Sequence, residues 1–353
     1  MEGILFRRPR PLMHTILPDS QVGFRPGYDI TDQLLKVQTH LEDMTHNRQL
    51  TTIMMALDIQ KAFDTVWIDG LLWKLAATEI PAPITRWIAH HLNNRTANTK
   101  HHTKLSPTFT LHAGLPQGSR LSPLLYTIFV ADIPQPREPL VALAQYADDT
   151  CYWSSATCVR NAKRKLQRTL IPYTQWCNLW RIKINPDKSQ IMAIKARRLK
   201  HPDAYPILLN GHPLRYTRTL KYLGVTFNNR IHPQTHIRNI LHTVRTTLRT
   251  FRHLAGVRKH GCHPRTLLHL YKAIVRPVIL YAAPLLIRLR PTAKERVTTF
   301  ERKILRIIYN LPFARNRQVY REANILPLPD YCPQRIERYL RKAADRPLLR
   351  DLI

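Results

Sequence analysis

Hydrophobic and polar residues alternate in two different ways along this chain. Between about Thr51 and Phe227, short and almost wholly apolar runs are separated by stretches with helical spacing; the runs include TTIMMALDI (51–59), PLVALAQY (139–146), CYWSSA (151–156) and SQIMAIK (189–195). Short apolar runs bounded by polar or turn residues are typical of buried strands. This part is therefore predicted to mix strands and helices.

Beyond residue 230 the pattern changes to a helical one. Three long segments, 234–255, 264–283 and 293–312, carry apolar residues at three- and four-residue intervals, with Arg, Lys or His between them. This spacing predicts amphipathic helices with a basic outer face. The sequence thus indicates a mixed core followed by a helical, basic region.

Charge narrows the choice of partner. The 353 residues contain 55 Lys+Arg against 23 Asp+Glu, which gives a formal net charge of +32. Such self-repulsion is relieved by a polyanion, which also releases its counterions on binding. Nucleic acid is therefore the leading expected partner, and an anionic membrane surface is the second.

Neither a membrane span nor a secretory signal is expected. The most apolar stretch, residues 273–287, is interrupted by Arg276, Pro277 and Pro284, and it falls short of the roughly 18 apolar residues of a spanning helix. At the amino terminus, basic residues follow the only short apolar run, which is the reverse of a secretory signal. The five cysteines show no paired CxxC spacing, so neither a zinc ribbon nor a disulfide framework is supported. An intracellular protein is expected.

Two aspartates stand side by side where strand patterning favours apolar residues. Asp148 and Asp149 lie between PLVALAQY and CYWSSA, at or beside a predicted hairpin turn, and Asp58 lies at the end of the run 51–59. Adjacent carboxylates repel one another, so a cation should offset them. If the strand ends are neighbours, the three carboxylates would suit hard divalent cations such as Mg²⁺. The alternative is that the aspartates only favour a tight turn.

Six motifs follow one another along the chain: ILPDSQVGFRPGYDITDQLL (16–35), ALDIQKAFDTV (56–66), GLPQGSRLSPLLYTIFVADI (114–133), QYADDT (145–150), INPDKSQIM (184–192) and KYLGVTF (221–227). In sequence and spacing, the last five resemble the successive palm motifs of reverse transcriptases, and the first resembles a fingers segment. The likeness is greatest to non-LTR retrotransposons of the Jockey-like type. It implies an α+β fold of the right-hand polymerase kind: partial fingers (1–50), a palm with an antiparallel sheet and an inserted fingers segment (51–230), and a helical basic thumb with a carboxy-terminal extension (231–353).

The resemblance also implies a reaction and its central residues. The activity would be RNA-directed DNA polymerisation, in which the 3′-hydroxyl of a DNA primer, paired to an RNA template, attacks the α-phosphate of a dNTP. Asp58, Asp148 and Asp149 would be the catalytic triad and the metal ligands, with the Ile59 backbone carbonyl completing one metal shell. The cofactor would be two Mg²⁺ ions, with Mn²⁺ as an alternative. The oligomeric state is not indicated.

Further roles are implied for residues around the triad. Phe63 would lie under the sugar of the nucleotide and reject a 2′-hydroxyl, Gln117 and Gly118 would contact the nucleotide or template, and Lys188 would approach the triphosphate. The plainer alternatives are core filling for Phe63, an ordinary loop for Gln117 and Gly118, and a solvent-facing lysine. Asp64 is expected to be structural.

The segment Tyr222, Leu223 and Gly224 would form the primer grip, unless it is only a strand bend, and the basic helices after 230 would contact the phosphates of the duplex. Nuclear synthesis at a DNA target is expected, with the cytoplasm as an alternative.

Some features depart from the family pattern. Only about twenty residues precede Gln21, where relatives carry a longer fingers portion with a triphosphate-binding arginine, and neither an endonuclease nor an RNase H is recognised. A truncated, catalytically inactive relic that only binds nucleic acid is therefore the alternative function. An RNA-dependent RNA polymerase is disfavoured, because a small polar residue would be expected where Phe63 stands.

Overall fold

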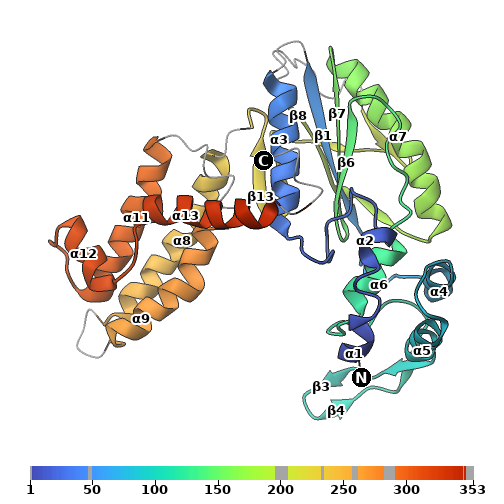
Figure 1. Cartoon of the computed structure of the whole chain (residues 1–353), viewed down its shortest axis with the longest axis horizontal. Coiled ribbons are helices and arrows are strands. Elements are labelled where there is room, and N and C mark those ends of the chain that lie inside the picture. The colour runs from blue at the N-terminus through green and yellow to red at the C-terminus, as the bar shows by residue number, and fades with distance from the viewer. Residues whose placement is uncertain are drawn as a thin grey trace. The chain divides into compact units, whose positions relative to one another are not determined.

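The structure is a computed structural model that describes residues 2–46, 50–194, 206–231, 234–256, 261–281, 291–344 and 346. It contains two compact units (Figure 1). The sheet unit comprises Met1–Gln33 and Thr39–Leu223, and the helical unit comprises Leu34–Gln38 and Gly224–Ile353. The assignment of fingers, palm and thumb to particular residue ranges stays a prediction.

A five-stranded sheet forms the centre of the sheet unit. Its order is β11-β8-β1-β7-β6, with β1 (Thr51–Ile59), β6 (Val141–Tyr146), β7 (Asp149–Ala156), β8 (Ile184–Ile194) and β11 (Arg215–Tyr216). All pairings are antiparallel except that of β11 with β8. The predicted strands at 51–59, 139–146 and 151–156 are confirmed. The run predicted at 189–195 belongs to a longer strand that begins at Ile184, and Lys195 lies outside the described residues.

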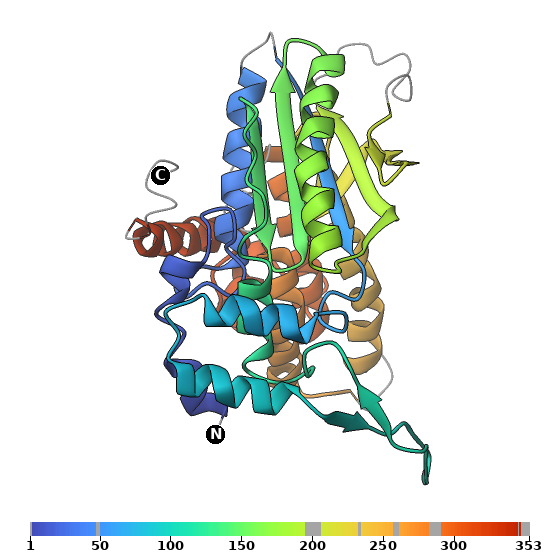
Figure 2. The ribbon, with the colours of Figure 1, turned by 90° about the vertical axis from the view of Figure 1, so that its right-hand side faces the viewer.

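The central position of β1 explains its unbroken apolar sequence. Four consecutive residues, 52–55, are buried, which requires cover on both faces of the strand. On one face the long helix α7 (Val159–Leu179) packs against β7 and β1 (Figure 2). The polar residue Asp58 comes after this buried stretch, where the strand ends.

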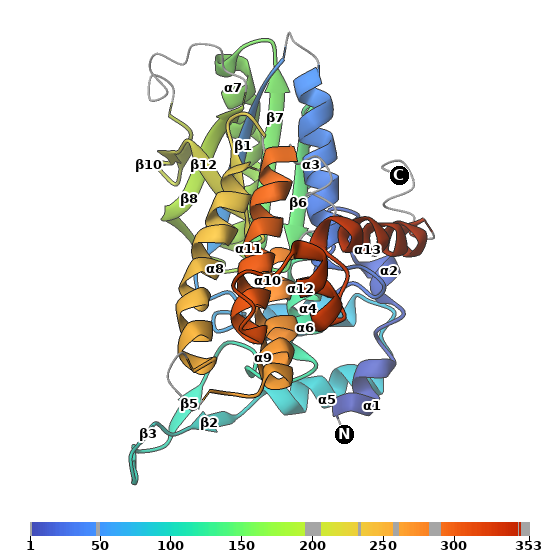
Figure 3. The ribbon, with the colours of Figure 1, turned by 90° about the vertical axis from the view of Figure 1, so that its left-hand side faces the viewer.

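Shorter elements surround the sheet. The helices are α1 (Glu2–Arg7), α2 (Met13–Ile16), α3 (Ile30–His46), α4 (Ile68–Ala76), α5 (Ala82–Leu92) and α6 (Ser122–Phe129), and the strands are β9 (Leu208–Leu209), β10 (His212–Pro213) and β12 (Thr219–Tyr222). Two further strand pairs, β2 (Arg95–Ala97) with β5 (Phe109–Leu111) and β3 (Lys100–His101) with β4 (Lys104–Leu105), form a narrow arm (Figure 3). The sequence analysis did not predict this arm.

Besides Leu34–Gln38 of α3, the helical unit contains β13 (Val225–Asn228) and is otherwise built from helices. They are α8 (Gln234–Leu254), α9 (Pro264–Leu270), the π-helical turn η2 (Tyr271–Val275), α10 (Arg276–Ile279), α11 (Pro291–Tyr309), α12 (Asn316–Ala323) and α13 (Leu328–Ala343). Their apolar faces enclose a core of their own. The predicted basic, helical region after residue 230 is confirmed for its described residues.

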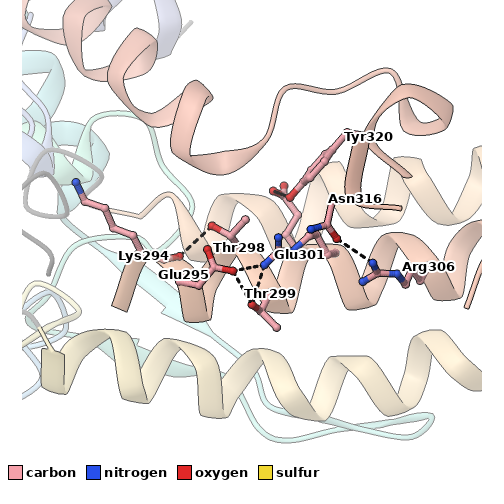
Figure 4. Close-up of polar contacts among 9 residues, drawn as sticks. Lys294, Glu295, Thr298, Thr299, Glu301, Arg306, Asn316 and Tyr320 are labelled. Carbon is pink, nitrogen blue, oxygen red and sulfur yellow. Dashed lines mark hydrogen bonds and ion pairs between the residues drawn. The ribbon is translucent and has the colours of Figure 1, made fainter. Parts of the chain in front are cut away.

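One buried carboxylate joins most of these helices. Glu301 of α11 is fully buried and accepts hydrogen bonds from the Tyr271 hydroxyl (2.5 Å), the Tyr320 hydroxyl (3.0 Å) and the Leu328 amide (2.9 Å). Figure 4 shows Glu301 beside Tyr320. The Arg276 Nε lies 3.9 Å from the same side chain. A buried carboxylate needs such partners, so Glu301 ties η2, α10, α12 and α13 to α11.

None of the described helices combines the length and the apolar character that crossing a membrane requires. The apolar run that starts at Ala273 is helical through Ile279, and its part after Tyr281 lies outside the described residues.

Candidate active site

The two adjacent aspartates lie at the turn between β6 and β7. Tyr146 pairs with Asp149 across the hairpin, which leaves Ala147 and Asp148 as the two turn residues. The predicted hairpin turn is confirmed. Ala147 has a φ of 56°, a left-handed value that costs a residue with a Cβ atom about 1–2 kcal/mol.

The strand register brings Asp58 to the same edge of the sheet. Leu57 of β1 pairs with Thr150 of β7, so the next position along places Asp58 opposite Asp149. Directly opposite residues on antiparallel strands project from the same face, with Cβ atoms about 5 Å apart. Asp148 precedes Asp149 in the turn. The register therefore places Asp58 and Asp149 at the same end of neighbouring strands, next to the turn that holds Asp148. That the three side chains act together stays a prediction.

Burial and neighbouring negative charges disfavour the ionised forms of Asp148 and Asp149. Desolvation and the charges of Asp148 and Asp58 raise the pKa of Asp149 to about 6. Desolvation, and also the charge of Asp58, raises the pKa of Asp148, although its own backbone amide opposes this effect. A carboxyl group whose pKa rises through like charges is one that a nearby cation would relieve.

Within the described residues, no Lys, Arg or His forms an ion pair with Asp58, Asp148 or Asp149. Over those same residues, the side chains do not assemble any group of three or more His, Cys, Asp or Glu that could by itself hold a metal ion. The donor chemistry nevertheless suits a hard cation, because Mg²⁺ is bound through one or two carboxylates and retains several waters. The metal-binding role of these aspartates, and of Ile59 at the end of β1, stays a prediction.

The bulge in β8 lies beside Asp58. Asp58 pairs with Asn185 and Ala56 pairs with Gln190, so β8 carries extra residues between these two pairings. The Ser189 hydroxyl accepts a hydrogen bond from the Asp58 amide (3.1 Å) and thereby fixes the bulge. Lys188 is exposed within it. Bulges commonly redirect side chains next to active sites, but the role of Lys188 stays a prediction.

Phe63 is linked to the carboxylates through Tyr126 of α6. The two rings stack with centroids 4.7 Å apart and planes inclined by 26°. Tyr126 is buried, and its pKa is raised well above the usual value, first by desolvation and then by the charges of Asp148 and Asp149 among others. Phe63 thus packs on a residue that experiences the charges of the site. Tyr126 was not singled out from the sequence, where it reads as one apolar position of a helix.

The loop that carries Gln117 is attached to the turn after β1. The Leu115 amide donates to the Phe63 carbonyl (2.7 Å), and the Gln117 side-chain amide donates to the Asp64 carboxylate (2.8 Å). Gly118 follows with a φ of 91°, which is open to glycine at no steric cost. Asp64 contacts Gln117 in this way, and its expected structural role fits this contact.

Tyr222, Leu223 and Gly224 lie where β12 ends and β13 begins. Leu223 and Gly224 have φ values of 45° and 75°, the signs required at both central residues of a type I′ hairpin turn. The Tyr222 hydroxyl donates to the Ala144 carbonyl of β6 (3.3 Å), so this turn is attached to the strand that leads to Asp148. The primer-grip role stays a prediction.

The buried side chain of Gln21 contacts the β6–β7 turn, which the sequence analysis missed. Its Oε1 accepts from the Ala147 amide (3.0 Å), and its Nε2 donates to the Ala147 carbonyl (3.3 Å). The available signal was the motif SQVGFRPG, which was interpreted only as a fingers segment.

Comparisons with known proteins bear on the family of this chain. The family model described as "Reverse transcriptase (RNA-dependent DNA polymerase)" matches residues 4–227. Two relatives from Drosophila melanogaster are the probable RNA-directed DNA polymerase from transposon BS (30% identical) and the RNA-directed DNA polymerase from mobile element jockey (29% identical). Each alignment covers 92% of this chain, which spans only 36% of either relative. Among solved structures, telomerase from Candida tropicalis in complex with the TWJ fragment of telomeric RNA has a TM-score of 0.48 and 11% identity, over 92% of this chain and 56% of that one.

Proposed function

The chain belongs to the reverse transcriptase family, and we propose that it carries the RNA-directed DNA polymerase activity of a Jockey-like non-LTR retrotransposon. The fold is α+β, of the right-hand polymerase type. One observation carries the proposal: the β1–β7 register, which pairs Leu57 with Thr150, places Asp58 and Asp149 at the same end of these two strands, beside Asp148 in the β6–β7 turn. Desolvation and the charges of neighbouring aspartates raise the pKa of Asp148 and of Asp149, so their placement favours a role toward cations.

Reverse transcriptases generally use divalent metal ions. We infer that this chain uses two Mg²⁺ ions, with Mn²⁺ as an alternative, and that Asp58, Asp148, Asp149 and the Ile59 carbonyl hold them. When bound, such ions would stabilise the charge on the attacking and leaving oxygens of the phosphoryl transfer.

The residues around the carboxylates would orient the nucleotide. The Phe63 ring stacks on Tyr126, which holds it in place. In this position the ring would exclude a 2′-hydroxyl of the incoming nucleotide by steric clash. Gln117 is held by Asp64 and would bind the nucleotide or the template strand. Lys188, exposed in the β8 bulge, would approach the triphosphate.

The RNA template and the DNA primer would be bound largely through phosphates. In the helical unit, two adjoining cavities of about 450 and 300 Å³ run between α8 and α11. Four exposed basic side chains line them, Arg238 and Arg245 from α8 and Arg296 and Lys303 from α11. We call these four residues the basic groove.

The basic groove suits a polyanion better than an apolar ligand. Its apolar lining, for example Ile237, Leu241 and Phe300, is almost wholly buried. One exposed carboxylate, Glu295, also lines it but is paired with Arg302, so the unpaired charges that remain are cationic. None of the four cations is ion-paired to a carboxylate of the described chain. On each helix the two cations are seven residues apart, or about 10.5 Å. That distance corresponds to about three phosphates along one strand of a duplex.

Primer extension tests the proposal. On a poly(rA) template with an oligo(dT) primer, the chain should add dTMP in the presence of Mg²⁺ or Mn²⁺ and should add none in EDTA. The Asp58→Ala variant, purified in parallel, should bind the same primer–template without extending it. A metal-independent signal, or equal extension by Asp58→Ala, would refute the assignment of the site.

A further inference from the structure

The turn that presents Asp148 is held in an unfavourable conformation. Ala147 has a φ of 56°, although a residue with a Cβ atom rarely adopts such a value. It is followed directly by two carboxylates that repel each other and Asp58. Both effects act against the observed geometry, so other contacts must maintain it.

Gln21 supplies these contacts. Its side chain is fully buried, and its amide binds both polar groups of the Ala147 backbone, as a neighbouring strand would. The same Oε1 also accepts from the Gly23 amide (2.9 Å), which fixes the orientation of the side chain.

The backbone around Gln21 is itself attached to β6. Gln21 and Gln145 form a parallel bridge, in which the Gln145 amide donates to the Ser20 carbonyl (2.8 Å) and the Val22 amide donates to the Gln145 carbonyl (3.1 Å). A Cβ atom on Gly23 would lie 2.3 Å from the Ala147 nitrogen, so the segment approaches the turn closely only because residue 23 is glycine.

We propose that Gln21 is a positioning residue of the polymerase site, whose side-chain amide holds Ala147 and thereby fixes the carboxylate of Asp148 relative to Asp58 and Asp149. This inference rests on the proposed function. Gln21 does not touch the reacting atoms; it acts through the turn. Rate is sensitive to displacements of about 1 Å in such a constellation, whereas binding of primer and nucleotide depends on other contacts.

The structure offers a matched control. Gln33 is an equally buried amide at the same junction, and it donates to the Gln145 carbonyl (3.2 Å) and the Ser20 carbonyl (3.4 Å) without a hydrogen bond to Ala147. Gln21→Met and Gln33→Met each remove a buried amide of similar size from this junction. Only the first removes contacts with the turn.

The experiment measures kcat and KM for dTTP in primer extension, together with thermal unfolding. Gln21→Met should lower kcat by about 10- to 100-fold with KM changed by no more than about twofold. Gln33→Met should lose comparable stability and keep kcat within about threefold. Adding Ala147→Gly to Gln21→Met should restore part of kcat, because glycine adopts the positive φ without strain. Equal losses of kcat in both single variants, or none in Gln21→Met, would overturn the proposal.

Hydrogen exchange at the Ala147 amide separates this inference from the proposed function. The amide should exchange faster in Gln21→Met than in the intact chain, and at an unchanged rate in Gln33→Met. If this exchange pattern is found but the intact chain does not extend primers, the proposed function is wrong, whereas the inference that Gln21 holds Ala147 is supported. An unchanged exchange rate in Gln21→Met would refute the inference that Gln21 holds Ala147, whether or not the chain extends primers.

Discussion

The two units of the molecule treat carboxylates in opposite ways. In the helical unit, Glu301 is fully buried, accepts three hydrogen bonds and lies beside Arg276. In the sheet unit, Asp58, Asp148 and Asp149 lie at one end of neighbouring strands, where desolvation and the charges of neighbouring aspartates raise the pKa of Asp148 and Asp149.

This difference separates a structural carboxylate from a functional one. The partners of Glu301 offset its desolvation, so removing this carboxylate would leave several buried polar groups without a partner. The charges of Asp148 and Asp149 disfavour the folded state, because a carboxyl group with a raised pKa is less easily ionised there than in the unfolded chain. A cluster that costs stability and remains open to a cation is what a metal-dependent site requires.

The largest expected effect is on chemistry in the sheet unit. Asp58→Ala should reduce primer extension to background, since it removes one of the facing carboxylates. Its affinity for an RNA–DNA duplex should fall with salt concentration at the slope of the intact chain, because no phosphate contact is lost. Extension rates and filter binding at several salt concentrations measure the two effects. A changed slope would mean that Asp58 also shapes the nucleic-acid surface.

The largest expected effect on stability is in the helical unit. Glu301→Ala should cost about 3–5 kcal/mol in the free energy of unfolding, because Tyr271, Tyr320, the Leu328 amide and Arg276 all lose a buried partner. The matched control is Glu295→Ala on the same helix (Figure 4), whose exposed carboxylate pairs with Arg302. That change should cost less than about 1 kcal/mol. Urea unfolding followed by circular dichroism compares them, and similar losses would contradict the role given to Glu301.

Nucleotide selection should belong to the sheet unit alone. Phe63→Val should raise the use of rUTP relative to dTTP by about tenfold or more, since the lost ring volume admits a 2′-hydroxyl. Arg296→Gln in the basic groove should leave this ratio unchanged. Competition assays with both nucleotides give the ratio directly. If it does not move in Phe63→Val, the ring packs against Tyr126 for structural reasons only.

Phosphate binding should in turn depend on the helical unit. Arg245→Gln and Arg296→Gln should each reduce the slope of log affinity against log salt by about 0.9 if the cation meets one phosphate of a duplex. Arg341→Gln serves as a control, because Arg341 is exposed on α13 and already paired with Glu337. It should leave the slope unchanged. Equal small effects from all three variants would indicate diffuse attraction without a defined groove.

Some elements of the sheet unit could be predicted from local sequence patterns. The strand 51–59 was predictable because a central strand needs an unbroken apolar run, and the turn at Asp148 because two strand-like runs flank it. The start of β8 was not, because INPDK reads as a turn, whereas here it forms a bulge within a strand.

Long-range contacts were beyond such patterns. Gln21 meets Ala147 across 126 positions of sequence, and nothing local to either residue indicates the pairing. Likewise, Glu301 looks like one more polar position in an amphipathic helix. Its burial becomes visible only once Tyr271, Tyr320 and Leu328 are packed around it.

The smallest expected change in the free energy of unfolding gives the most direct test, because a single variant, Asp149→Asn, reports on both stability and function. The pKa of Asp149 is about 6 in the folded protein and near 3.8 when unperturbed. Between these values the folded state holds a proton that the unfolded state has released, so the stability of the intact chain should fall as pH rises from about 4 to 6. Asp149→Asn removes this penalty.

The measurement is the free energy of unfolding of Asp149→Asn and of the intact chain from pH 4 to pH 8 without divalent metal, with primer extension at pH 8. We predict that the two proteins are nearly equal in stability at pH 4. The variant should become the more stable one as pH passes 6, and it should fail to extend primers at pH 8. A variant that is less stable at pH 8, or that still extends primers, would contradict the claim that this carboxylate serves chemistry at the expense of folding.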